Sequence, residues 1–327
     1  MKKLLISTAL ISSVFALSSA AIAEMKVSGS IEQTWKSASY DTSNTSANSV
    51  MKGSSGLGQE TNVKFSGSQD LTNGLKTSGH IQLEDSAIDS TAINIGNGTF
   101  TVTFGVDTNN TINTTIIPRV GDDEHTVAGA TVSTTDGLSS YSAHDKQHVG
   151  LTANVGIGEI VLNYAPSSAG VAEGDSSVTD SGGSATEITY SGEVMPGLKV
   201  LVGQQVTEAA NGGNNATERT YQGAYTHGAF GIGYAHRSYD NKASTTEIGK
   251  VVVASVSYAA SDKLSFSVSK AETDTDGSSV QEEITLFGVG YNLGGLAVTA
   301  QFAETKNIGA VAGDDGESFQ VRTVYAF

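Results

Sequence analysis

Apolar and polar residues alternate at every second position in segment after segment of this chain, and the 3.6-residue period of an amphipathic helix is almost absent. The last ten residues, SFQVRTVYAF, show the pattern clearly. Phe319, Val321 and Tyr325 fall on one face, and Gln320 and Arg322 fall on the other. Segments of this kind are β-strands with one apolar and one polar face. The pattern predicts an all-β fold of sixteen strands between residues 25 and 327.

Two kinds of connection alternate between these strands. One kind is tight and rich in Gly and Asn, as at residues 72–74, 97–98 and 293–295, where positive φ angles are tolerated. The other kind is longer and polar, as at residues 41–56 and 108–146. Seven tight turns and eight longer connections join the sixteen strands. The tight turns therefore lie at one end of the sheet and the longer loops at the other.

An apolar face can be buried in two ways, and the aromatic residues favour one of them. A soluble sandwich turns two apolar faces toward each other, and this alternative remains open. Aromatic residues gather near the strand ends, as in the girdles of outer-membrane barrels. They are Trp35, Tyr164, Tyr190, Tyr225, Tyr258, Tyr291 and Tyr325. Lipid offers no partners to backbone amides, so a sheet in a membrane must close. We predict a transmembrane antiparallel β-barrel.

The first 23 residues have the form of a secretory signal peptide. Lys2 and Lys3 precede a short apolar run, and Ala21-Ile22-Ala23 supplies the small-x-small cleavage pattern. A membrane anchor is the alternative, but the run is short for a span. Residues 24–327 then form the barrel. Removing two lysines and no acids changes the net charge from −16 to −18, which argues against a nucleic-acid partner. The chain has no cysteine, so disulfides and thiol chemistry are excluded.

Three stretches resemble the Gram-negative general porins of the sixteen-stranded kind. They are AIAEMKVSGSIEQTW after the signal, NGTFTVTFG before the long third loop, and the terminal VYAF. The resemblance implies a homotrimer with three pores in the bacterial outer membrane, surrounded by lipid and lipopolysaccharide. It also implies that the barrel-assembly machinery reads the last strand. Two features depart from the family: the second loop, near Ser86, is short, and the third loop lacks a Pro-Glu-Phe-Gly-Gly motif.

The third loop, residues 108–146, is the candidate for narrowing the pore, because it is far longer than a loop tip requires. We expect it to fold into the lumen. It contains the sequence PRVGDDEH, with Arg119, Asp122, Asp123 and Glu124. Clusters of charge at a constriction set ion selectivity. The alternative is a solvated loop tip.

Strand parity predicts which basic side chains face the lumen. These are Lys26, Lys36, Lys64, Lys76 and Arg322, all on strands around the barrel closure. The family resemblance implies that such a basic wall faces an acidic third loop. The alternative is that each is an ordinary wetted lumen residue. At the closure itself, the new amino group of Glu24 and the carboxylate of Phe327 are expected to pair.

Other signals are weak. His144 and His148 have the spacing of a zinc pair on a helix, but they fall at a loop–strand junction without a neighbouring glutamate. Two acidic stretches, DTDGSS and GDDGE, resemble parts of a calcium-binding loop. They predict, at most, adventitious binding of divalent cations such as calcium at outer loops. We expect no metal site, no cofactor and no enzymatic activity, and a passive channel for small hydrophilic solutes and ions. The alternatives are a barrel adhesin or barrel enzyme without channel activity, and a soluble exported β-protein.

Overall fold

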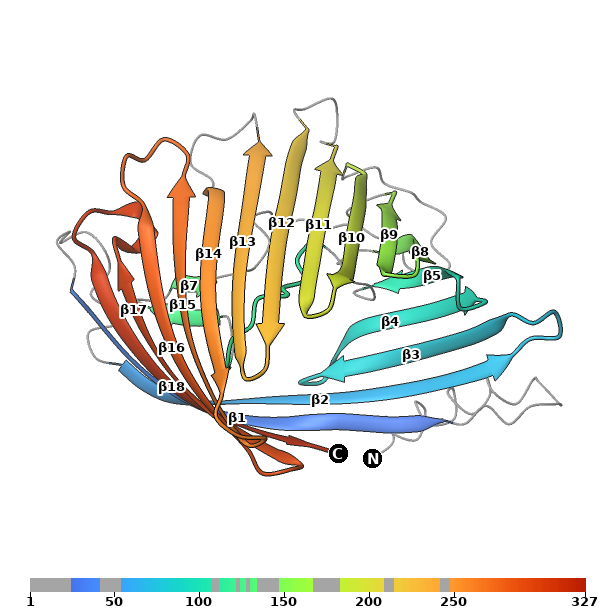
Figure 1. Ribbon diagram of the computed structural model, residues 1–327, viewed down its shortest axis with the longest axis horizontal. Helices are drawn as coiled ribbons and strands as arrows, with labels where there is room; N and C mark the ends of the chain where they lie inside the picture. The colour runs from blue at the N-terminus through green and yellow to red at the C-terminus, as the bar shows by residue number, and fades with distance from the viewer. Residues whose placement is uncertain are drawn as a thin grey trace.

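A computed structural model gives the architecture, and it describes residues 25–41, 54–106, 112–121, 124–127, 130–133, 147–166, 183–208, 215–241 and 248–327. Sixteen antiparallel strands form one closed barrel, and β6 and β7 form a separate two-stranded sheet. Figure 1 shows the ring, with the blue first strand beside the red last strand. The predicted all-β barrel of sixteen strands is confirmed. No helix among these residues is long and apolar enough to cross a membrane.

The strands of the barrel follow chain order around the ring, except that β6 and β7 are left out between β5 and β8. Their bounds are β1 Lys26–Asp41, β2 Ser54–Asp70, β3 Lys76–Glu84, β4 Ala87–Gly96, β5 Phe100–Val106, β8 His148–Asn154, β9 Gly158–Ala165, β10 Ala185–Met195, β11 Leu198–Thr207, β12 Ala216–His227, β13 Phe230–Asn241, β14 Ile248–Ala259, β15 Leu264–Thr275, β16 Glu282–Asn292, β17 Leu296–Lys306 and β18 Asp315–Ala326. The separate two-stranded sheet consists of β6 Glu124–Val127 and β7 Ala130–Ser133. A 3₁₀ turn, η3, spans Ile308–Ala310.

The alternation in the sequence becomes the difference between the two faces of the wall. On β18, Phe319 and Tyr325 are 38% and 51% exposed, whereas Gln320 is 2% exposed. On β12, Tyr221 is exposed and Gln222 is buried. The exposed apolar side chains therefore point away from the lumen, and the buried polar ones point into it. This arrangement is the reverse of a water-soluble domain and matches a barrel in lipid.

The tight turns and the longer loops separate to opposite ends of the barrel, as the sequence predicts. The tight turns use glycines at positive φ, for example Gly74 at 80° and Gly98 at 86°. A side chain at these φ values is strained, which explains the choice of glycine. One loop at the other end, between β3 and β4, is only two residues long, Asp85 and Ser86, and both have positive φ.

The barrel closes where the last strand pairs with the first. The register runs from Ser30 opposite Ala326 to Asp41 opposite Asp315. Beyond it, the amide of Gly29 donates to the carbonyl of Phe327, and the amide of Phe327 donates to the carbonyl of Gly29, both at 3.0 Å. The chain terminus is thus part of the sheet. Glu24, predicted to pair with the terminal carboxylate, lies outside the described residues.

Two predictions from the sequence pattern are wrong. The pattern predicts a second strand that begins near Gln59, but β2 begins at Ser54, because its polar, glycine-containing start still pairs with β1. In β16, Ile284 and Leu286 alternate out of phase with Phe287, which predicts a bulge, but the register with β15 and β17 is continuous. Ile284 and Leu286 instead point into the barrel and are fully buried. Something inside the lumen must cover them.

Gly29 is the position at which the seam tolerates least change. A Cβ atom built there lies 2.3 Å from the carbonyl oxygen of Asn62 and 2.8 Å from the ring of Phe327. We expect Gly29→Ala to lower the free energy of unfolding in detergent by about 1–3 kcal/mol, through overpacking at the seam. Urea titration followed by heat-dependent gel mobility measures this change.

Gly223→Ala on β12 is the matched control, because a Cβ atom there meets nothing within 4 Å. Its urea midpoint should equal that of the unaltered protein. If the urea midpoint of Gly29→Ala equalled that of Gly223→Ala, the close packing of the seam at Gly29 would be contradicted.

Candidate pore interior

A segment of irregular backbone, residues 112–121, runs along the inner face of the wall and is held by side chains from several strands. Its amides donate to wall acceptors. The bonds are Ile112 N–H to Glu187 Oε1 at 3.1 Å, Ile116 N–H to Gln222 Oε1 at 3.0 Å, and Val120 N–H to Ser267 Oγ at 2.9 Å. We call residues 112–121 the inner strap.

The carbonyls of the inner strap are satisfied in the same way. Arg237 Nη2 donates to the carbonyls of Asn113 and Thr114, at 2.9 and 3.2 Å. Gln222 Nε2 donates to Thr114 at 2.8 Å, and Gln301 Nε2 donates to Val120 at 3.1 Å. Buried backbone without a sheet partner must find hydrogen bonds elsewhere. Polar wall side chains from β10, β12, β13, β15 and β17 provide them.

The middle of the inner strap also buries apolar surface. Ile117 packs in a cluster of buried residues from the strap and from β13–β16. The other members are Ala235, Val251, Val253, Ala271 and Ile284. Glycines on the wall make room for the strap: a Cβ atom at Gly233 would lie 2.5 Å from Pro118, and one at Gly288 would lie 2.5 Å from Val120.

This contact is not predicted by strands with one apolar and one polar face, which give a uniformly polar inner face. The VVVAS stretch of β14 and the ITLF stretch of β16, however, carry apolar residues on both faces. A strand that is apolar on both faces is covered on both faces. That signal was present and predicts an internal partner for these strands.

At the seam, a charged pair joins the first and last strands across the lumen side. Arg322 on β18 forms an ion pair with Glu32 on β1. Thr34 Oγ1 donates to the same carboxylate at 2.7 Å, and Thr34 is the register partner of Arg322. Both charged side chains are mostly buried. Arg322, predicted as a pore-wall residue, therefore has a carboxylate partner from the strand beside it.

The other predicted wall lysines lie at different places on the inner face. Lys26 and Lys64 line one shared cavity of about 240 Å³ between β1 and β4. Lys36 lies further toward the loop end of β1, opposite Gln320. Lys76 lies at the tight-turn end and forms an exposed ion pair with Asp70, with an N–O distance of 3.6 Å. The five basic residues thus do not form one cluster.

The predicted constriction residues are only partly described. Arg119 lines a cavity of about 660 Å³ with Val120 and the tight-turn ends of β12–β17. It therefore lies on the wall that carries the inner strap, across the barrel from Lys64. Asp122 and Asp123 lie outside the described residues, as does the side chain of Glu124. The strand that begins at Glu124, β6, lies next to β18 and β1.

The histidine pair that the sequence offered as a weak zinc signal is only partly described. His148 is buried on β8, and His144 lies outside the described residues. Within the described ranges, no group of three or more His, Asp or Glu side chains is arranged to hold a metal ion. The described part of the inner face therefore offers charges and hydrogen-bond donors, without a metal-binding cluster among them.

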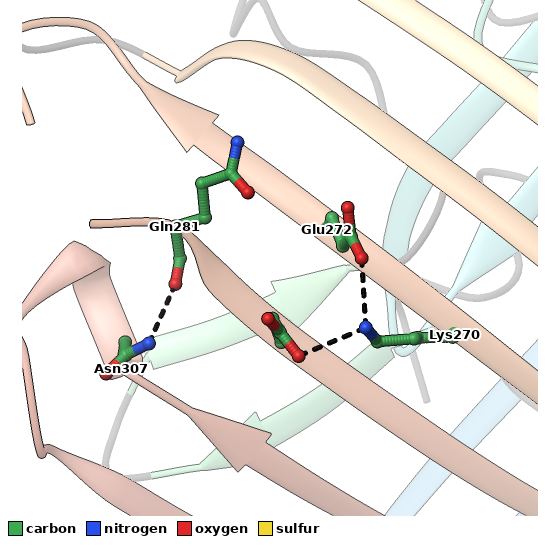
Figure 2. Close-up of polar contacts among 5 residues, drawn as sticks. Lys270, Glu272, Gln281 and Asn307 are labelled. Carbon is green, nitrogen blue, oxygen red and sulfur yellow. Dashed lines mark hydrogen bonds and ion pairs between the residues drawn. The ribbon is translucent and has the colours of Figure 1, made fainter. Parts of the chain in front are cut away.

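The outer face carries a second set of charges above the apolar band. Lys270 on β15 forms ion pairs with Glu272 at 2.9 Å and with Glu283 on β16 at 3.1 Å. Nearby, the side-chain amide of Asn307 donates to the carbonyl of Gln281 at 3.0 Å, which ties the β17–β18 loop to the start of β16. Figure 2 shows Lys270 beside Glu272, and Asn307 beside Gln281.

The inner strap depends on Arg237, which is 1% exposed. Arg237→Met keeps the aliphatic stem but removes the described donor to the Asn113 carbonyl and one of the two donors to the Thr114 carbonyl. We expect this change to release the strap, since each buried unsatisfied group costs about 1–3 kcal/mol. The chain has no cysteine, so a single Ile117→Cys variant reports strap exposure through its rate of reaction with a thiol reagent.

The reaction should be slow in the otherwise unaltered protein and at least several-fold faster with Arg237→Met. Arg219→Met serves as the control, because Arg219 is on the opposite face of the wall and contacts Gln204. A rate unaffected by Arg237→Met would show that the strap does not depend on that side chain.

Comparisons with known proteins agree with this architecture. A family model described as Gram-negative porin matches residues 7–327. The anion-selective porin from Comamonas acidovorans matches at a TM-score of 0.65 and 14% identity, over 94% of this chain and 100% of that one. A variant of the Rh. blastica porin matches at a TM-score of 0.62 and 15% identity, over 93% of this chain and 100% of that one. OmpT of Vibrio cholerae, described as outer-membrane expressed, matches at a TM-score of 0.63 and 13% identity, over 95% of this chain and 99% of that one. No curated protein sequence matches.

Proposed function

Because the chain belongs to the Gram-negative porin family and is a passive channel of the bacterial outer membrane, we propose that its lumen passes small hydrophilic solutes and ions through a charged constriction, without any chemical step. One observation supports this proposal above the others. The sixteen strands close into a ring whose outer face is apolar and whose inner face is polar. A ring of that strand number leaves an aqueous lumen.

The constriction we propose is the third loop, folded into the lumen as a whole. The inner strap supports this, because it ends at Gly121 beside Gln301 of β17. The strand β6 supports it too, because it begins at Glu124 and lies next to β18 and β1. Asp122 and Asp123, which lie outside the described residues, stand between Gly121 and Glu124 in the sequence.

This placement puts the acidic segment 122–124 beside β18 and β1, next to the strands β1 and β2 that carry Lys26 and Lys64. Acidic and basic charges then lie close together at the narrow part of the lumen. Fixed charges of both signs there align polar solutes and set the balance between cations and anions. The Comamonas acidovorans porin is described as anion-selective. At 14% identity, the match supports a shared fold and does not extend that selectivity to this chain.

The acids of the loop should make the pore more permeable to cations. Replacing Asp122, Asp123 and Glu124 with Asn, Asn and Gln is expected to shift the reversal potential in a salt gradient toward the anion value. The shift should shrink with rising salt, because the charges are screened. Planar-bilayer recording measures both quantities.

The matched control removes acids from the outer face. Glu304 and Glu317 point away from the lumen on β17 and β18, so Glu304→Gln with Glu317→Gln should leave the reversal potential unchanged. An equal shift in the two sets of variants, or none in the loop variant, would place the loop acids outside the constriction.

We also propose the assembly and export that the family resemblance implies. Residues 1–23 act as a cleaved signal, residues 24–327 form the barrel, and the terminal strand is read by the barrel-assembly machinery. Three barrels associate in the outer membrane, in contact with lipid and lipopolysaccharide. The loop between β3 and β4 is too short to latch onto a neighbour, so the trimer contact is expected on the walls themselves. Conductance steps in groups of three support this assembly, and single steps argue for a monomer.

A further inference from the structure

The cavity shared by Lys26 and Lys64 is a distinct recess in the inner wall, across the barrel from the inner strap. It measures about 240 Å³ and lies near the tight-turn end of β1–β4. The side chains around it all come from inward-facing positions of these strands. They are Lys26, Lys64, Ser66, Ser68, Ser78, His80 and Asn94.

The sheet register places these groups in adjacent rows. Lys26 is opposite Ser66, and Ser66 is opposite His80, so one row crosses three strands. Ser68 is opposite Ser78, and Ser78 is opposite Asn94, which gives a second row directly below the first. Lys64 stands two residues above Ser66 on β2. Two ammonium groups and three hydroxyls therefore surround one small volume.

The charge of this recess is the reverse of the charge of the chain. The protein has 34 acidic and 18 basic residues, yet no carboxylate lines the cavity. In the described part of the chain, neither Lys26 nor Lys64 forms an ion pair. Among the described residues, Asp70 is the acid at the tight-turn ends of β2 and β3, and it is held by Lys76 at the rim. Two lysines without a carboxylate partner among the described residues attract anions.

The neutral groups are oriented to donate. The Oδ1 atom of Asn94 already accepts from Thr103 at 2.7 Å, so its amide nitrogen, which contacts Ser78 at 3.4 Å, is the end that faces the cavity. His80 Nε2 lies 3.3 Å from Ser90 Oγ on the next strand. Hydroxyls can turn their protons toward an anion. The recess thus offers many donors around two positive charges.

We propose that this recess is a binding subsite for phosphate-type oxyanions, that is, inorganic phosphate or the phosphate group of a small phosphorylated solute. A phosphate has several acceptor oxygens and a charge near −2, which matches two lysines with surrounding hydroxyl and amide donors. A monocarboxylate carries one charge and two oxygens and leaves most of these donors unused. The proposal rests on the proposed function, since solutes reach the recess only through the lumen.

The test is conductance of the full-length protein in a planar bilayer with chloride as the carrier. Adding inorganic phosphate at constant ionic strength should reduce the chloride current in a saturable way. Acetate should need at least tenfold higher concentration for the same reduction. Equal effects of phosphate and acetate would overturn the assignment of phosphate.

Three variants locate the effect. Lys64→Gln should raise the half-saturating phosphate concentration about tenfold, and Lys26→Gln gives the same test from a different strand if the first variant folds poorly. The control is Lys199→Gln, which removes one positive charge from the tight-turn end of β11, on the face of Leu201 and Ala224. Lys199→Gln should leave phosphate binding within twofold of the unaltered protein.

Two outcomes separate this inference from the proposed function. If the channel conducts but phosphate has no saturable effect, or if Lys199→Gln weakens it as much as Lys64→Gln, the subsite is wrong and the channel stands. If no conductance is seen with correctly folded protein, the proposed function fails and the subsite fails with it.

Discussion

The backbone hydrogen bond is the interaction on which this structure depends. Lipid offers no donor or acceptor to an unpaired amide, so a sheet that exposes an apolar face to hydrocarbon has no tolerable edge. The two edge strands of this sheet, β1 and β18, pair with each other through twelve register pairs, from Ser30–Ala326 to Asp41–Asp315. The pairing leaves neither edge exposed. The exchange of bonds between Gly29 and Phe327 extends the seam to the last residue of the chain. Every other feature follows from this closure, because closure creates the inner face.

The inner face works as a set of hydrogen-bond partners for backbone that is not in the sheet. The inner strap lies in irregular conformation inside the barrel, and its amides and carbonyls are satisfied by Glu187, Gln222, Arg237, Ser267 and Gln301. The glycines of β13 and β16 let the strap approach the wall closely. The strap thereby covers part of the inner face between β10 and β17, whereas Lys26 and Lys64 on β1 and β2 line a cavity.

The strand pattern, the tight turns and the closing strand could all be predicted from the sequence, because each depends on local rules. Alternation gives the face of a residue, and Gly at positive φ gives a turn. The contact between Ile117 and the wall could not be predicted this way, since it joins residues more than a hundred positions apart. The apolar residues on both faces of β14 and β16 are its local sign in the sequence, and on β16 the same pattern also predicts a bulge, which the structure does not have.

The charged residues also have one property set by local rules and one set by long-range contacts. The alternation of faces along a strand predicts that Lys26, Lys64 and Arg322 point inward, but it does not predict their partners. Arg322 meets Glu32 only because the register of the seam brings β18 next to β1. Lys26 and Lys64 share a recess only because the rows of β1–β3 align. Partners of this kind are set by strand register, which the sequence pattern leaves undetermined by two residues in either direction.

Hydrogen–deuterium exchange of the protein in lipid bilayers tests the closure most directly, read at the amides of Gly29 and Phe327. Both amides should exchange as slowly as those of a fully paired central strand such as β16, although one belongs to the last residue of the chain. Exchange at the rate of an unpaired peptide, with β16 still protected, would mean that the seam is open and would contradict the account.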